Sequence, residues 1–196
     1  MSFDELVTVL KPKVDGSVYL DELFSENTLD FFVFFSSISA VTGNAGQANY
    51  GAANSFMCSM AAHRRNRGLA ASVINIGVII GVGYVTREVT TSGLNHLHKN
   101  GYMWMSESDF HQTFAEAILA GRPESGLTPE ITTGLRLIKS DESHLPIWYD
   151  NPVFQKQILK SRDVELEDNT VKSTVPIKLQ LMEVTNVSQL HEIIKG

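Results

Sequence analysis

The chain has a single cysteine, no long apolar run and no excess of positive charge, and each scarcity excludes a class of protein. Cys58 cannot form an intrachain disulfide, which favours a reducing, cytoplasmic compartment. No run approaches the roughly 20 apolar residues of a membrane-spanning helix, and the N-terminus lacks the features of a secretory signal. The net charge of −6 argues against a nucleic-acid surface, because such surfaces neutralise phosphates with lysine and arginine. We therefore expect a cytoplasmic protein with neither membrane nor nucleic acid as a partner.

A glycine-rich turn of the kind that binds a dinucleotide is missing as well. Folds that bind dinucleotides normally begin with a strand, a G-x-G-x-x-G turn and a helix, and no such turn precedes Lys13. The glycines after Ile76 do not qualify, because no helix clearly follows them. The chain does have 43% hydrophobic residues, which is enough for the core of one domain.

The spacing of these apolar residues predicts alternating helices and strands. The expected helices cover residues 3–10, 14–24 after a break at Pro12, 47–67, and 110–119 with Ser106 as N-cap. The expected strands cover residues 29–35, 71–76 and 130–137, and the first of them has the near-continuous apolar run of a strand buried on both faces. Residues 85–102 are expected to be mobile and partly helical. The predicted fold class is α/β, the C-terminal portion of a Rossmann-like doubly wound parallel sheet with a helical tail.

Two side-chain clusters have ordinary structural interpretations. Cys58 lies among methionine and alanine residues, which favours a small buried hydrophobe over a nucleophile. Arg64, Arg65 and Arg67 crowd the end of the expected helix over residues 47–67. They could form a basic patch, although complementing the negative end of a helix is the commoner arrangement.

Polar residues with a shared chemistry follow the first predicted strand. Tyr50 and Asn54 are four residues apart, so they share one face of a helix, and Ser37 comes from the end of the strand. A tyrosine with a pKa of about 10 becomes a usable proton donor when a lysine cation lowers that pKa. A serine hydroxyl can bind a carbonyl oxygen on which charge develops. Taken singly, these residues are more often packing or turn residues, but together with a lysine they suit reduction of a ketone by a nicotinamide cofactor.

The same residues carry a resemblance to a known family. Ser37 stands thirteen residues before Tyr50, the spacing of the short-chain dehydrogenase/reductase family. That family usually has a lysine where this chain has Asn54, and the order Tyr-x-x-x-Asn is similar to ketoreductase domains of polyketide and fatty acid synthases. Those domains take their lysine from an upstream context like Lys-Pro-Lys-Val-Asp-Gly, which matches residues 11–16 and Lys13. The phrase FFSSISAVTGNAGQANYGAANSFM particularly resembles iterative, highly reducing fungal polyketide synthases.

The resemblance implies a role for each matching residue. Tyr50 would donate the proton, and Ser37 would orient the substrate carbonyl. Lys13 would lower the tyrosine pKa and contact the cofactor ribose, and Asn54 would complete the relay. The substrate would be a β-ketoacyl chain on the phosphopantetheine of an acyl carrier domain, and other synthase domains would be further partners. The cofactor would be NADPH, contacted by Lys13, Tyr50, Asn75 and Gly77.

The resemblance also implies a division of the chain. Residues 1–153 would be the catalytic part of a ketoreductase domain whose N-terminal cofactor-binding strands are missing, with a substrate lid at about residues 85–102. Residues 154–175 would be a linker, and residues 176–196 the start of an acyl carrier domain. One alternative is a catalytically silent ketoreductase fragment that acts as a structural or interaction module, because the glycine-rich turn is absent. A weaker alternative is a free-standing dehydrogenase for small alcohols.

Overall fold

Three parallel strands form the central sheet. They lie in the order β1 (Val33–Ser37), β2 (Ser72–Ile76) and β5 (Glu130–Thr132). The structure is a computed structural model, and it describes residues 2–26, 28–81, 87 and 89–159. The predicted crossover from β1 through a helix to a parallel β2 is confirmed, while the predicted strand over residues 130–137 ends earlier, at Thr132.

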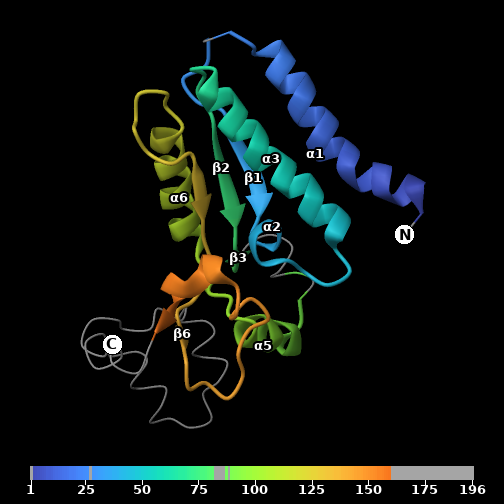
Figure 1. Ribbon diagram of the computed structural model, residues 1–196, viewed down its shortest axis with the longest axis vertical. Coiled ribbons are helices and arrows are strands. Elements are labelled where there is room, and N and C mark those ends of the chain that lie inside the picture. The colour runs from blue at the N-terminus through green and yellow to red at the C-terminus, as the bar shows by residue number, and fades with distance from the viewer. Residues whose placement is uncertain (1, 27, 82–86, 88, 160–196) are drawn as a thin grey trace.

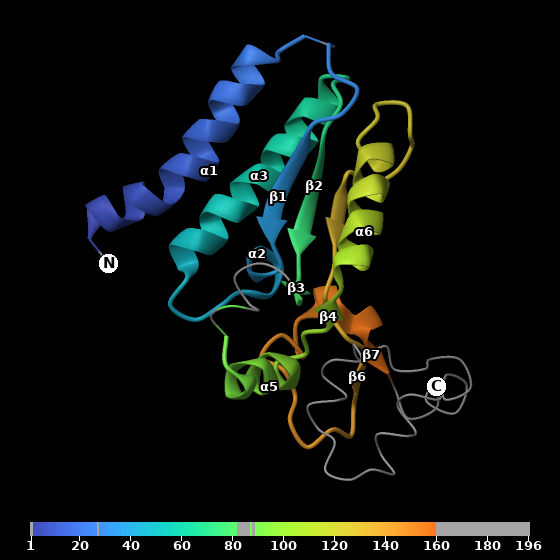
Figure 2. The same cartoon turned by 180° about the vertical axis from the view of Figure 1, so that it is seen from behind.

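Helices cover both faces of this sheet. Helix α3 (Ala48–Asn66) packs on one face and α6 (Glu107–Ala120) on the other, and α1 (Phe3–Leu23) lies alongside α3 (Figure 1 and Figure 2). This layering of helices on a parallel sheet is the predicted Rossmann-like α/β class. Gly68 ends α3 as expected, in the left-handed conformation with a φ of 75°.

Helix α1 is continuous, so the predicted break at Pro12 is wrong. A capping box fixes its start: the Ser2 hydroxyl accepts the Glu5 N–H at 3.3 Å, and the Glu5 carboxylate accepts the Ser2 N–H at 2.6 Å. Pro12 has no backbone N–H to donate to the carbonyl one turn earlier. A proline inside a helix therefore destabilises it by about 3 kcal/mol. Packing of α1 against α3 offsets that cost, so Lys13 lies in mid-helix rather than in a first turn.

Arg64 joins α3 to the end of α1. Its side chain is fully buried, its guanidinium lies over the Phe32 ring at 4.3 Å, and it donates to the Asp21 carboxylate at 2.5 Å and to the Phe24 carbonyl at 3.1 Å. Arg67 donates to the same carboxylate at 2.7 Å. These two arginines therefore bind internal acceptors instead of forming a free basic patch.

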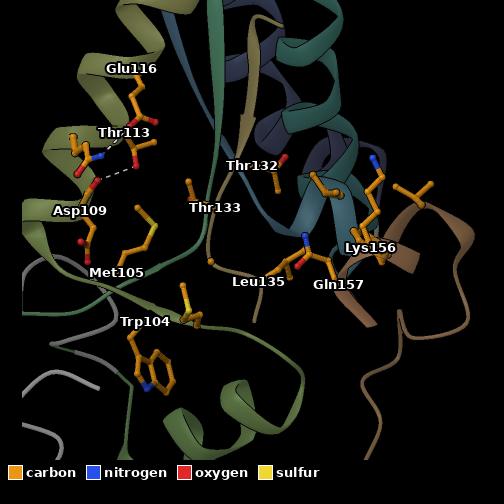
Figure 3. Close-up of a pocket in the computed structure, with 16 residues that line it drawn as sticks. Trp104, Met105, Asp109, Thr113, Glu116, Thr132, Thr133, Leu135, Lys156 and Gln157 are labelled. Carbon is orange, nitrogen blue, oxygen red and sulfur yellow. Dashed lines mark hydrogen bonds between the residues drawn. The ribbon is translucent and has the colours of Figure 1, made fainter. Parts of the chain in front are cut away.

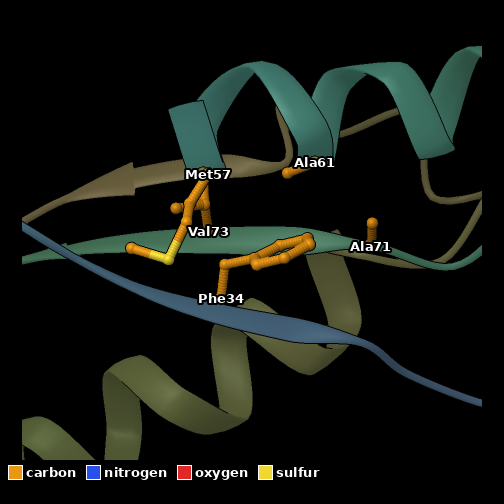
Figure 4. Close-up of a cluster of buried hydrophobic side chains, with 5 residues drawn as sticks. All are labelled: Phe34, Met57, Ala61, Ala71 and Val73. Atoms are coloured by element: carbon orange, nitrogen blue, oxygen red, sulfur yellow. The ribbon is translucent and has the colours of Figure 1, made fainter. Parts of the chain in front are cut away.

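The main hydrophobic core lies between the sheet and α3 (Figure 4). Its buried members are Phe34, Met57, Ala61, Ala71 and Val73. The alanines let the helix approach the strands closely. Cys58 packs against this cluster, and burial raises the pKa of its thiol, which agrees with the predicted structural role.

Strand β1 is less enclosed than the sequence predicts. On the face opposite α3, Phe35 packs against Phe110 and Phe114 of α6, with ring centroids 6.1 and 5.9 Å apart, but it remains 43% exposed. Within the part of the chain that the structure describes, β1 has a neighbouring strand on one side alone. The expectation of a strand buried on both faces was wrong here, because β1 lies at an edge of the sheet.

The N-terminus of α6 confirms a local prediction. Ser106 is the N-cap: its hydroxyl accepts the Asp109 N–H at 3.1 Å, and the Asp109 carboxylate accepts the Ser106 N–H at 2.8 Å. An aspartate thus completes the capping box in place of the more usual glutamate.

Apart from the short helix α2 (Ser39–Thr42) that follows β1, the remaining elements lie beyond the C-terminal ends of the strands (Figure 1). They are β3 (Val78–Ile79), α5 (Thr91–Lys99), β4 (Trp104–Met105), β6 (Ile138–Lys139), η1 (Pro152–Gln157) and β7 (Ile158–Leu159). Strand β3 pairs with β4, and β6 pairs with β7, both in parallel. Residues 154–159 of the predicted linker therefore take part in regular structure. The rest of that linker and the predicted helical tail lie outside the described residues, and the domain division stays a prediction.

Candidate active site

Two elements bring Ser37 and Tyr50 to the same end of the sheet. Ser37 is the last residue of β1, and Tyr50 lies in the first turn of α3, which runs back along the strands (Figure 2). The connection contains the short helix α2 (Ser39–Thr42) and two glycines, Gly43 and Gly46, each with a φ of 77°. Because glycine adopts this left-handed conformation without strain, the chain can reverse direction here within a few residues.

Lys13 reaches this end of the sheet from α1. Its ammonium lies 5.8 Å from the centroid of the Tyr50 ring and donates to the Phe35 carbonyl at 3.1 Å. Burial lowers the pKa of Lys13, because desolvation disfavours the charged amine. The predicted approach of Lys13 to Tyr50 is thus observed, although the two residues belong to different helices.

Asn54 is held inside α3, one turn after Tyr50. Its side-chain N–H donates to the Tyr50 carbonyl at 2.7 Å, and its own backbone carbonyl accepts the Ser36 hydroxyl at 3.3 Å. The side chain is fully buried, and its Oδ1 has no hydrogen-bond partner among the described residues. This unfilled acceptor is suited to a water or another donor that links Asn54 to its surroundings.

Asn75 lies in β2 with its side chain fully buried against α3 and β5. It donates to the Glu130 carboxylate at 2.7 Å and to the Thr132 hydroxyl at 3.1 Å, and it accepts the Cys58 thiol at 3.3 Å. All of these contacts are internal. They give Asn75 a structural explanation, and its predicted contact with a cofactor stays a prediction.

Gly77 follows β2 at a point where two backbone segments touch. A Cβ at this position would lie 2.6 Å from Gly134 Cα and 2.9 Å from the Thr133 carbonyl oxygen. The Gly77 N–H donates to the Thr133 hydroxyl at 3.2 Å. Close backbone approach is thus sufficient reason for glycine here, and its predicted cofactor role also stays open to test.

A cavity of about 640 Å³ lies beside the end of β5 (Figure 3). Asp109, Thr113 and Glu116 of α6 line one side, while Lys156 and Gln157 of η1 line the other. The four predicted catalytic residues do not line this cavity, so we do not assign it to the reaction. Sequence reasoning missed it because its walls come from distant segments that share no motif.

Among residues 2–26, 28–81, 87 and 89–159, no helix combines the length and apolar character needed to cross a membrane. Nor do these residues bring together three or more histidine, cysteine, aspartate or glutamate side chains that could hold a metal ion.

Known proteins are similar to this chain in sequence. Residues 1–81 match the family model described as KR domain. The hybrid PKS-NRPS synthetase poxE of Penicillium oxalicum is 52% identical over 196 residues, and a polyketide synthase-nonribosomal peptide synthetase of Aspergillus clavatus is 50% identical over 194 residues. These alignments cover 100% and 99% of this chain but 5% of each relative, so the chain spans a small part of their length.

Solved ketoreductase structures share the fold. An A1-type ketoreductase superposes with a TM-score of 0.59 at 27% identity, covering 69% of this chain and 26% of that one. The ketoreductase from the first module of phoslactomycin biosynthesis in Streptomyces sp. HK803 gives a TM-score of 0.58 at 31% identity, covering 68% and 29%.

In sequence over residues 1–81, and in fold, the chain is therefore similar to ketoreductase domains, a class of oxidoreductase domain. The sequence relatives reported above are, more narrowly, fungal synthetases that combine a polyketide synthase with a nonribosomal peptide synthetase.

Proposed function

We propose that this chain supplies the catalytic residues for NADPH-dependent reduction of a carrier-bound β-ketoacyl thioester to a β-hydroxyacyl thioester. The observation that carries the proposal is the position of the Lys13 ammonium, 5.8 Å from the Tyr50 ring centroid, at the strand end that holds Ser37. An iterative, highly reducing synthase is the setting that we propose for the reaction.

Three side chains have separate roles in the proposed reduction of the substrate carbonyl. Ser37 donates a hydrogen bond to the carbonyl oxygen and orients it. The Tyr50 hydroxyl gives this oxygen its proton as charge develops there. The nearby Lys13 ammonium stabilises the phenolate that remains. Asn54 holds the turn of α3 that carries Tyr50, through its 2.7 Å bond to the Tyr50 carbonyl.

The described residues fit part of a nicotinamide cofactor. NADPH, when bound, supplies the hydride that the carbonyl carbon receives. The Lys13 ammonium and Tyr50 hydroxyl are donors suited to ribose hydroxyls, and the unfilled Asn54 Oδ1 is a buried acceptor on the same helix as Tyr50. A glycine-rich phosphate cradle is not found among residues 2–26, 28–81, 87 and 89–159. We propose that another part of the synthase provides it along the open edge of β1.

An acyl carrier domain is the proposed source of the substrate. The relatives are PKS-NRPS synthetases far longer than this chain, which supports other synthase domains as its partners. The open edge of β1 also favours a second candidate function. Without a phosphate cradle among its described residues, the chain would serve as a catalytically silent structural module.

An assay of the synthase polypeptide that contains this chain separates these candidates. We expect NADPH fluorescence to decline when a β-ketoacyl thioester is presented on the carrier domain, with slower turnover from NADH. A silent module predicts no NADPH consumption by a folded protein. If the chain belonged to a simple alcohol dehydrogenase, small free ketones would be reduced as fast as the carrier-bound thioester. Either of these two results would contradict our proposal.

A further inference from the structure

The Ser37 hydroxyl has both of its acceptor positions filled by a single neighbouring residue. Its Oγ accepts the Ser39 N–H at 3.3 Å and the Ser39 hydroxyl at 2.9 Å. A serine hydroxyl offers one donor and two acceptor positions. With both acceptor positions occupied, Ser37 can interact with a further group only by donating its own proton.

The position of Ser39 is fixed by surrounding backbone. The Ile38 N–H donates to the Ile76 carbonyl at 2.9 Å, which ties the residue before Ser39 to the end of β2. The Gly43 N–H donates to the Ser39 carbonyl at 3.1 Å and closes α2. Ser39 itself is 9% exposed, so its hydroxyl is largely shielded from water that could compete for Ser37.

We propose that Ser39 is a positioning residue that keeps the Ser37 hydroxyl directed outward as a donor to the substrate carbonyl. This inference rests on the proposed function, since it assigns a purpose to the orientation of Ser37. Without the Ser39 hydroxyl, Ser37 regains a free acceptor position and can rotate its proton away from the substrate. Ser39 acts only through Ser37 and does not touch the reacting atoms.

A double-mutant cycle in the synthase polypeptide tests this coupling. We expect Ser39→Ala to lower kcat for the carrier-bound β-ketoacyl thioester about tenfold with little change in KM, because the loss falls on the transition state. Ser39→Thr keeps a hydroxyl at the same position and should restore most of the lost rate. In the Ser37→Ala background, Ser39→Ala should cause no additional loss, because the group it positions is gone.

Ser55→Ala is the matched control, since Ser55 is an exposed serine on α3. It should leave kcat unchanged, and thermal unfolding of each variant shows whether the fold is retained. Wild-type kcat in Ser39→Ala, or a double mutant in which the two losses multiply, would overturn the inference. Failure of the proposed function gives a different pattern, because Ser37→Ala and Tyr50→Phe would then themselves leave turnover intact.

Discussion

At the scale of single residues, Ser36 and Ser37 have different surroundings although they are neighbours in β1. Ser36 is buried, and its hydroxyl donates to the Asn54 carbonyl at 3.3 Å, so it fixes α3 against the strand. Ser37 is half-buried at the strand end, where Ser39 holds its hydroxyl. The spacing to Tyr50 was enough to predict Ser37. The contact of Ser36 could not be predicted, because it depends on how closely α3 packs.

Gly77 is a glycine at which we expect a side chain to be damaging because backbone lies against it. Gly77→Ala places a Cβ 2.6 Å from Gly134 Cα, and backbone cannot move aside as a flexible side chain can. We expect a loss of about 2–3 kcal/mol in the free energy of unfolding, measured by denaturant titration.

Gly16→Ala is the matched control for that prediction. Gly16 lies inside α1, and its added Cβ would meet no atom within 4 Å. Because alanine favours the helix over glycine, this variant should gain about 0.5–1 kcal/mol. Equal losses in Gly77→Ala and Gly16→Ala would contradict the close-approach explanation of Gly77.

At the scale of elements, Asp21 holds α1 in the position that presents Lys13 to Tyr50. Its carboxylate oxygens form ion pairs with the Arg64 guanidinium at 2.5 Å and with the Arg67 guanidinium at 2.7 Å. Burial by itself raises the pKa of Asp21, but the hydrogen bonds and charges of Arg67 and Arg64 more than reverse this, so the pKa lies below its ordinary value. The native state thus binds this proton more weakly than the unfolded chain does.

Asp21→Asn should therefore remove a pH-dependent contribution to stability. Above the unfolded-state pKa of about 3.9, the wild type keeps the full stabilising contribution of the ionised Asp21 carboxylate. This contribution is lost as the pH falls through the lower pKa of the folded state. We expect Asp21→Asn to cost about 2 kcal/mol at pH 7, because Arg64 stays buried without its anion. The difference in free energy of unfolding between variant and wild type, measured by urea titration, should become smaller below about pH 4. A difference that stays constant with pH would contradict this role of Asp21.

The sequence predicted local elements better than long-range contacts. Ser106 as N-cap and Gly68 as helix stop follow from neighbouring residues, and both are observed. The continuity of α1 through Pro12 depends on its packing against α3, which no local pattern encodes. The pairing of β6 with β7 joins two-residue strands that are too short to show a period. The catalytic candidates were found through spacing and resemblance, whereas the contacts of Asn75 and Ser39 required the fold.

At the scale of the whole molecule, the open edge of β1 and the exposed phenyl rings near it should make the isolated chain associate with itself. Phe31 is 47% exposed just before β1. Because unpaired edges and exposed apolar groups promote association, we expect Phe31→Lys to reduce self-association in sedimentation velocity. Phe3→Lys is the control: Phe3 is 76% exposed in the first turn of α1 and does not belong to the segment that leads into β1. An equal effect of the two substitutions would show that the edge is not the cause.

The most direct test of the proposed ketoreductase site is Tyr50→Phe in the synthase polypeptide, which removes one hydroxyl and retains the ring near Lys13. We expect kcat for the carrier-bound β-ketoacyl thioester to fall by about 100-fold or more, because the proton donor is lost. The Kd for NADPH, measured by cofactor fluorescence, should rise by less than about tenfold, since one proposed ribose donor is lost while Lys13 remains. Wild-type turnover by a folded Tyr50→Phe variant would contradict the assignment of Tyr50 as the proton donor.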